Sequence, residues 1–114
     1  LTGGHVLIAV PNPESHDAKH YGKHWAAWDV PIHVHHFTKQ SMIKMMEDAG
    51  FQHLSITPMN MDSYYISLLS EQYKSASDSK SIKNWLNAVL QGFKSNYNSK
   101  KDNTSSLIYT FRLN

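Results

Sequence analysis

The chain of 114 residues contains no cysteine, one arginine and five glycines. Without cysteine it forms no disulfide bonds, no thiolate metal sites and no redox chemistry on sulfur. Its longest apolar run, Val6 to Val10, is far shorter than the ~20 residues that a transmembrane helix needs. No charged segment followed by an apolar one opens the chain, so no secretory signal is visible. We therefore expect a cytoplasmic protein without membrane association.

The charge is nearly balanced, with eleven Lys and Arg residues against nine Asp and Glu residues and a formal net charge of +2. Nucleic-acid-binding proteins concentrate Lys and Arg on one face. Here the lysines are scattered, and only Lys100 and Lys101 are adjacent. This distribution disfavours nucleic acid as a partner. A hydrophobic content of 40% is enough for a packed core, and the length fits one small domain or part of a larger one.

Three segments have the pattern of β-strands. The first is a continuous apolar run between Gly3-Gly4 and Pro11-Asn12, typical of a strand buried on both faces in a parallel sheet. The second alternates, with Leu54 and Ile56 opposite His53 and Ser55. The third alternates up to the end of the chain. These strands are predicted at residues 5–10, 51–57 and 105–113.

Three segments have the pattern of helices, at residues 39–49, 62–73 and 81–97. Thr38 is the expected N-cap of the first, Gly50 its C-terminal cap and Asp62 the expected N-cap of the second. The last has the clearest apolar stripe, on which Trp85 is predicted to be a core residue. Residues 14–32 have no period and predict a long loop with at most one short helical turn. Alternating strands and helices indicate a layered α/β sheet.

The histidines are unevenly distributed, with seven of the eight between His5 and His36. The spacing His33-x-His35-His36 can place two imidazoles on one side of an extended segment, which keeps a His-rich metal-binding domain open as an alternative. No H-E-x-x-H or similar helical spacing supports it, and cysteine ligands are absent.

One ordered set of motifs points to a family. Gly3-Gly4 precedes a strand and Pro11-Asn12 follows it. A Trp-rich loop then leads into the pattern D-x-P-x-H-x-x-H-F-T at residues 29–38, a helix and Gly50-Phe51. Together with residues 62–74 and 105–109, this succession resembles the C-terminal portion of a bacterial branch of the class I S-adenosylmethionine-dependent methyltransferases.

The resemblance implies a Rossmann-like sheet in the order three-two-one-four-five-seven-six, with the last strand antiparallel. The predicted strands of this chain would be the fifth, sixth and seventh, lying side by side in the order first-last-middle. Residues 1–114 would then form a single partial domain, the C-terminal half of the fold. Residues 59–103 would be a helical insertion between the last two strands that partly covers the acceptor pocket.

The resemblance also implies what this chain does not supply. The family binds S-adenosylmethionine through a glycine-rich loop after its first strand and an acidic residue after its second. The five glycines here include no G-x-G pattern. We therefore expect no cofactor-binding residues in this chain, and a missing N-terminal half that binds most of the cofactor. The chain alone should be inactive. Ile32 also stands where related sequences carry arginine after the proline.

The site residues follow from the same motifs. A histidine in a methyltransferase pocket can act as a general base, although proximity and orientation can accelerate methyl transfer without one. The competing interpretations are that the histidines hold the loop in shape, that Pro11-Asn12 only makes a turn and that the aromatic residues are core. The predicted catalytic residues are His33 and His36. The predicted acceptor-binding residues are Pro11, Asn12, Trp25, Trp28, Asp29 and Phe37.

The leading hypothesis is therefore the acceptor side of a methyltransferase for a small-molecule acceptor. A non-catalytic binding or assembly module with half of the fold is the alternative, beside the metal-binding domain. In either case the backbone edge of residues 5–10 would lack its neighbouring strand. An unpaired apolar edge favours pairing with another chain, so self-association through this edge is expected.

Overall fold

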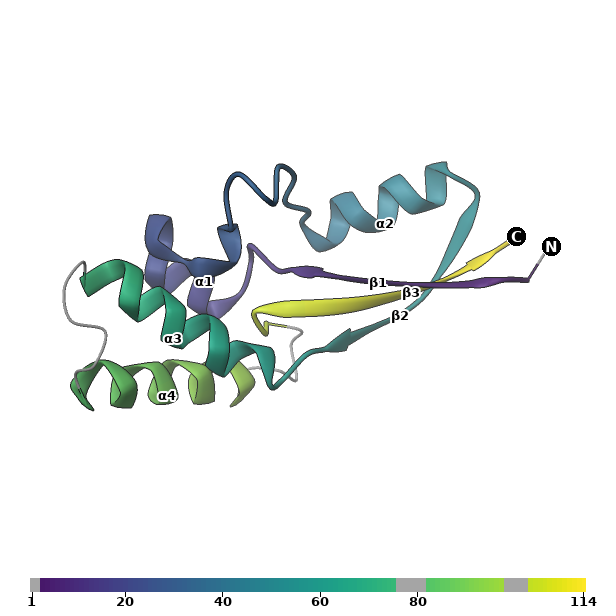
Figure 1. The fold of residues 1–114 in the computed structure, drawn as a ribbon. Helices are drawn as coiled ribbons and strands as arrows, with labels where there is room; N and C mark the ends of the chain where they lie inside the picture. The colour runs from purple at the N-terminus through teal and green to yellow at the C-terminus, as the bar shows by residue number, and fades with distance from the viewer. Residues whose placement is uncertain (1–2, 76–81, 98–102) are drawn as a thin grey trace.

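A computed structural model describes residues 3–75, 82–97 and 103–114 of the chain (Figure 1). Within these ranges no helix is both long and apolar enough to cross a membrane. The elements, in chain order, are β1 (His5–Pro11), α1 (His16–Tyr21), the 3-10 turns η1 (Gly22–His24) and η2 (Ala26–Trp28), α2 (Lys39–Asp48), β2 (Phe51–Pro58), α3 (Asp62–Ser75), α4 (Ile82–Tyr97) and β3 (Ser106–Leu113).

The three strands form one sheet in the order β1-β3-β2, so the predicted order first-last-middle is confirmed. β3 runs antiparallel to both neighbours, and Tyr109 lies opposite Ile8 on one side and Ile56 on the other. β3 is the central strand, and the side chains of Leu107, Tyr109 and Phe111 on one of its faces are at most 1% exposed. α2 covers this face of the sheet through Met42 and its neighbours, which gives the α/β layering expected from the sequence (Figure 1).

β2 departs from the simple alternation predicted for it. A β-bulge between His53 and Ser55 shifts the register against β3. The alternation therefore resets, so that His53 and Ile56 are both partly buried while Leu54 is exposed. The prediction that Leu54 and Ile56 share a face is wrong because the bulge inserts one extra residue between them.

The predicted long loop is also wrong, because residues 14–32 contain α1, η1 and η2. The Ser15 side chain caps α1 by accepting a hydrogen bond from the Ala18 amide at 3.1 Å. Gly22, at a φ of +53°, ends the helix after six residues. A helix this short has too few residues to display a period. The described ranges therefore contain four α-helices rather than about three.

α2 confirms its sequence signals. Thr38 is the N-cap and its Oγ1 accepts a hydrogen bond from the Ser41 amide at 3.2 Å. Gly50 follows the helix with a φ of +91°, the left-handed conformation that favours glycine. Met42, at 1% exposure, is the main contact of α2 with the sheet.

α3 and α4 lie where helices were predicted. Ser81, the first residue of the last predicted helix, lies outside the described residues, as do residues 76–80. Their buried faces differ from the prediction. α3 buries Ser63, Ser67, Ser70 and Glu71 and exposes Tyr65 and Tyr73. Among the α4 residues whose burial the structure describes, Ala88 and Gly92 are the buried ones.

The prediction that Trp85 is a core residue is wrong, because its side chain is 56% exposed. Small residues allow α4 to lie close to α3, and Gly92 stands against the Tyr64 ring. The larger apolar residues of α4 consequently remain outside the contact. α1, α3 and α4 gather beyond the end of the sheet where β1 stops and β3 begins (Figure 1).

Candidate functional site

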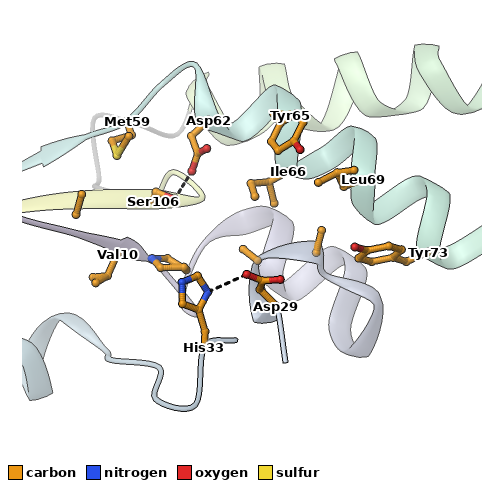
Figure 2. A pocket seen from close by; sticks show the side chains of 14 residues that line it. Val10, Asp29, His33, Met59, Asp62, Tyr65, Ile66, Leu69, Tyr73 and Ser106 are labelled. Carbon is orange, nitrogen blue, oxygen red and sulfur yellow. Dashed lines mark hydrogen bonds and ion pairs between the residues drawn. The ribbon is translucent and has the colours of Figure 1, made fainter. Parts of the chain in front are cut away.

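A cavity of about 390 Å³ opens at the carboxyl end of β1, between that strand, the η2 loop and α3 (Figure 2). In open α/β sheets, ligands bind outside the carboxyl ends of strands. The cavity is lined by Ala9, Val10, Pro11, Ala26, Ala27, Asp29, His33, Met59, Asp62, Tyr65, Ile66, Leu69, Tyr73 and Ser106.

Asp29 and His33 form the polar wall on the loop side. Asp29 ends η2 with a φ of +43°, a left-handed conformation that Asp tolerates better than most residues. Its backbone carbonyl accepts hydrogen bonds from the amides of Ile32 at 2.8 Å and His33 at 2.9 Å. The tight turn brings the Asp29 carboxylate to 3.6 Å from the His33 Nδ1 atom (Figure 2). The two predicted site residues therefore face each other at the cavity, with both side chains about 45% exposed.

His36 lies behind this wall. Its Nε2 atom donates a hydrogen bond to the Trp28 carbonyl at 2.9 Å, and its ring packs edge-on against the Trp28 indole at 4.8 Å. Trp28 in turn donates from Nε1 to the Gly22 carbonyl at 2.8 Å. Neither side chain lines the cavity. Both residues therefore make hydrogen bonds and a ring contact within the loop that carries Asp29 and His33.

Three other predicted acceptor-binding residues are also outside the cavity lining. Asn12 is 1% exposed, and its amide donates to the Thr104 carbonyl at 3.0 Å while its oxygen accepts from the Glu14 amide. Trp25 is 1% exposed and packs in the core with Tyr21. Phe37 packs against the sheet core beneath α2. Of the predicted residues, Pro11, Asp29 and His33 are the ones that the structure brings together at the cavity.

The opposite wall belongs to α3 and was not assigned to the site from the sequence. Tyr65, Ile66, Leu69 and Tyr73 provide its apolar surface (Figure 2). Asp62 adds a carboxylate that accepts a hydrogen bond from the Ser106 hydroxyl. The signal in the sequence is the expected position of this helical insertion over the acceptor pocket.

Polar side chains fix α3 in this position. The Ser70 hydroxyl accepts a hydrogen bond from the Ala26 amide at 2.8 Å, and Tyr21 donates to Glu71 at 3.1 Å. Burial and the neighbouring Glu71 carboxylate raise the pKa of the Tyr21 hydroxyl, so it remains a donor at physiological pH. These bonds tie α3 to η2 and α1, which form the other side of the cavity.

The described residues were compared with the requirements of a metal site and of a glycine-rich cofactor loop. Within the described ranges, no group of three or more His, Asp or Glu side chains could hold a metal ion. Gly3 and Gly50, both with positive φ, stand beside strands, while Gly92 packs inside a helix pair. None of them begins a loop whose amides could bind the carboxylate of S-adenosylmethionine. The described part of the chain therefore offers a cavity whose volume is in the range of small-molecule sites.

Comparison with known families identifies one relationship. Residues 2–56 match the model of a family described as a methyltransferase domain, a range that runs from the start of β1 almost to the end of β2 and includes Asp29 and His33. Among curated proteins and solved structures, nothing matches the chain significantly. Residues 2–56, slightly less than half of the chain, are therefore similar to a methyltransferase domain.

Proposed function

We propose that this chain is the acceptor-binding, C-terminal part of an S-adenosylmethionine-dependent methyltransferase. In this proposal β1, β2 and β3 are the fifth, sixth and seventh strands of a Rossmann-like sheet, and α3 and α4 are an insertion over the acceptor pocket. The observation that carries it is the position of the cavity. It lies at the carboxyl end of β1, with Asp29 and His33 of the family-matched segment on one wall.

The Asp29–His33 pair has the geometry of a general base with its orienting group. The carboxylate facing Nδ1 favours the tautomer that carries a proton there, which leaves Nε2 to accept one. S-adenosylmethionine supplies an activated methyl group when it is bound. The bond between the sulfonium sulfur and the methyl group would break, its electrons remaining on sulfur, as the acceptor's oxygen or nitrogen took the methyl group. Nε2 of His33 would take the proton that the acceptor loses. The role of His36 in this proposal is to position the loop rather than to accept the proton.

The charges of the cavity restrict the acceptor. Among the residues that the structure describes, its lining includes the carboxylates of Asp29 and Asp62 and no Lys or Arg. Anionic groups such as phosphates require cationic partners when they leave water. The remaining surface of Tyr65, Ile66 and Leu69 is apolar or aromatic. We therefore propose a neutral or cationic small molecule with an apolar portion that packs against α3.

The donor half would join the sheet at β1. Within the described residues β1 pairs with β3 alone, and Leu7 on this strand is 69% exposed. An unpaired edge beside an exposed apolar side chain is a template for another strand. We propose that the neighbouring strand of the donor-binding half pairs here, and that the isolated chain self-associates through the same edge.

Calorimetric titration of S-adenosylmethionine tests whether the donor-binding half, rather than this chain, binds the cofactor. The chain of 114 residues should give no measurable heat of binding, while the same chain joined to a donor-binding half should bind the cofactor. Tight binding to residues 1–114 alone would contradict the proposal, since it would place the donor site within this chain.

The base is tested in the joined protein with three histidine variants. His33→Gln should lower kcat roughly 100-fold, within the range that general bases contribute. His35→Gln is the matched control, because His35 is exposed in the same segment and does not line the cavity. His36→Gln should lower the melting temperature through loss of its bond to Trp28. Equal effects of the His33 and His35 variants on kcat would refute the assignment.

A further inference from the structure

The cavity at β1 has two polar ends, which lie on opposite walls (Figure 2). One end is the Asp29–His33 pair of the loop, to which the proposed function assigns proton transfer. The other is Asp62 in the first turn of α3, whose carboxylate has no part in that step. The rest of the lining is mainly apolar and includes Val10 and Ile66. The Asp62 end can therefore recognise a part of the acceptor that is remote from the methylated atom.

Two local features hold the Asp62 carboxylate at the cavity. The hydroxyl of Ser106, the first residue of β3, donates a hydrogen bond to its Oδ2 atom (Figure 2). The first turn of a helix also carries a partial positive charge, which stabilises a carboxylate there. Among the described residues, no cationic side chain forms an ion pair with Asp62. Its negative charge is therefore available to a cationic group of a ligand.

Tyr65 adds an aromatic ring beside this carboxylate. It follows Asp62 by three positions on α3, a spacing that places two side chains on the same face of a helix. Both residues line the cavity, and Tyr65, at 61% exposure, lies at its rim. The face of an aromatic ring attracts cations such as ammonium groups. A carboxylate and a ring one turn apart therefore favour a cationic group over a neutral or anionic one.

The cationic group bound at Asp62 is not the group that is methylated. A protonated amine has no lone pair with which to attack a methyl group, and a neighbouring carboxylate favours its protonated form. The nucleophile therefore belongs at the other end of the cavity, where Nε2 of His33 takes its proton in the proposed function. The two polar ends then bind two different groups of one acceptor, and the apolar side chains contact the portion that joins them.

We propose that the acceptor carries a cationic group, such as an ammonium, which binds at Asp62 and Tyr65 while a neutral nucleophile of the same molecule faces His33. This inference rests on the proposed function, because it assigns a second part of the same acceptor. It narrows the acceptor to molecules that have both groups, separated by an apolar portion. Asp62 is then a specificity-determining residue that takes no part in methyl transfer itself.

Three phenols of similar shape and different terminal charge test this by calorimetric titration into the chain of 114 residues. Tyramine ends in an ammonium group, para-propylphenol in a methyl group and para-hydroxyphenylpropanoate in a carboxylate. We expect tyramine to bind roughly tenfold more tightly than para-propylphenol, the effect of one hydrogen bond to a charged group, although the methyl group is the more apolar. The propanoate should bind most weakly, because it brings a negative charge to Asp62.

Matched variants locate the cation site. Asp62→Asn should weaken tyramine binding roughly tenfold and leave para-propylphenol binding unchanged, since the amide keeps an oxygen for the Ser106 hydroxyl but lacks the charge. Asp48→Asn is the control, because that carboxylate lies on α2 outside the cavity. Tyr65→Leu should weaken tyramine binding roughly threefold, whereas Tyr65→Phe, which keeps a ring, should not. Thermal melting followed by circular dichroism checks that the variants are folded.

Three outcomes would overturn the inference. They are tyramine binding no tighter than that of para-propylphenol, no heat from tyramine at millimolar concentrations, and a preference for tyramine that survives Asp62→Asn. The titration of S-adenosylmethionine decides the proposed function separately. A cavity that prefers para-propylphenol would exclude the cationic group and leave the assignment of this chain to the acceptor side of a methyltransferase intact.

Discussion

Asp17 provides the sharpest test of how the cavity is held together. It lies in the first turn of α1 at 0% exposure. One of its oxygens, Oδ2, accepts hydrogen bonds from the Trp25 indole Nε1 at 2.9 Å and from the Ser105 hydroxyl. It therefore joins the loop before η2 to the residue before β3, two segments that flank the cavity.

The cost of removing this carboxylate follows from the two donors that it satisfies. Asp17→Ala leaves the Trp25 N–H and the Ser105 O–H buried without it, and each unsatisfied donor costs about 1–3 kcal/mol, so we expect a loss of about 4 kcal/mol. Asp17→Asn retains an acceptor oxygen and loses only the charge, so about 2 kcal/mol is expected. For a chain of this length these losses lower the melting temperature by about 15 °C and about 8 °C.

Urea unfolding followed by circular dichroism measures both losses. Asp48→Ala is the control, since its carboxylate pairs with Lys44 on the surface of α2 at 2.9 Å with 65% exposure and contributes at most about 0.5 kcal/mol. If Asp17→Ala costs no more than Asp48→Ala, the buried carboxylate does not hold these segments and the reasoning is refuted. The free energy of unfolding should decrease in the order wild type, Asp17→Asn, Asp17→Ala, which provides a second check.

Two further predictions concern packing and pH. Gly92→Ala should destabilise the chain by about 1–3 kcal/mol in urea unfolding, because the added Cβ atom would overlap Tyr64. This loss is expected although alanine is the better helix former. Unchanged stability would show that α4 does not approach α3 this closely. Burial and the charge of Lys74 lower the pKa of His20 below 6.5, so the unfolded chain binds the proton more readily. The free energy of unfolding should therefore fall as pH drops through 6.5, and His20→Gln should reduce that slope in urea titrations at pH of about 7.5 and 5.5; an identical slope would exclude this contribution.

The sequence predicts the sheet well because strand signals here are local. The apolar run before Pro11, the alternation after Gly50 and the alternation at the end of the chain each identify a strand. The family resemblance then supplies the order that places β3 in the centre. The bulge at His53 was missed because nothing in residues 51–57 distinguishes a strand with an extra residue from a regular one.

The predicted residues that line the cavity are Pro11, at the end of β1, and the Asp29–His33 pair. Asp29 and His33 meet because one tight turn separates them. The α3 wall is set by contacts such as Ser70 with Ala26 and Glu71 with Tyr21, which join residues 44 and 50 positions apart. Periodicity indicates which residues share a face of a helix, but it does not indicate which face is inward.

The inward faces of α3 and α4 have a common physical basis. Both helices turn small side chains toward their neighbours, serines on α3 and Ala88 with Gly92 on α4. Small residues let backbones approach closely, and the serine hydroxyls add directional bonds, whereas apolar contact alone permits sliding. A helix held by bonds such as that from the Ala26 amide to Ser70 keeps one rotation about its axis. The same rotation that turns Ser70 inward directs Ile66 and Leu69 toward the cavity and leaves Tyr65 at its rim, so the buried serines of α3 determine the shape of the cavity.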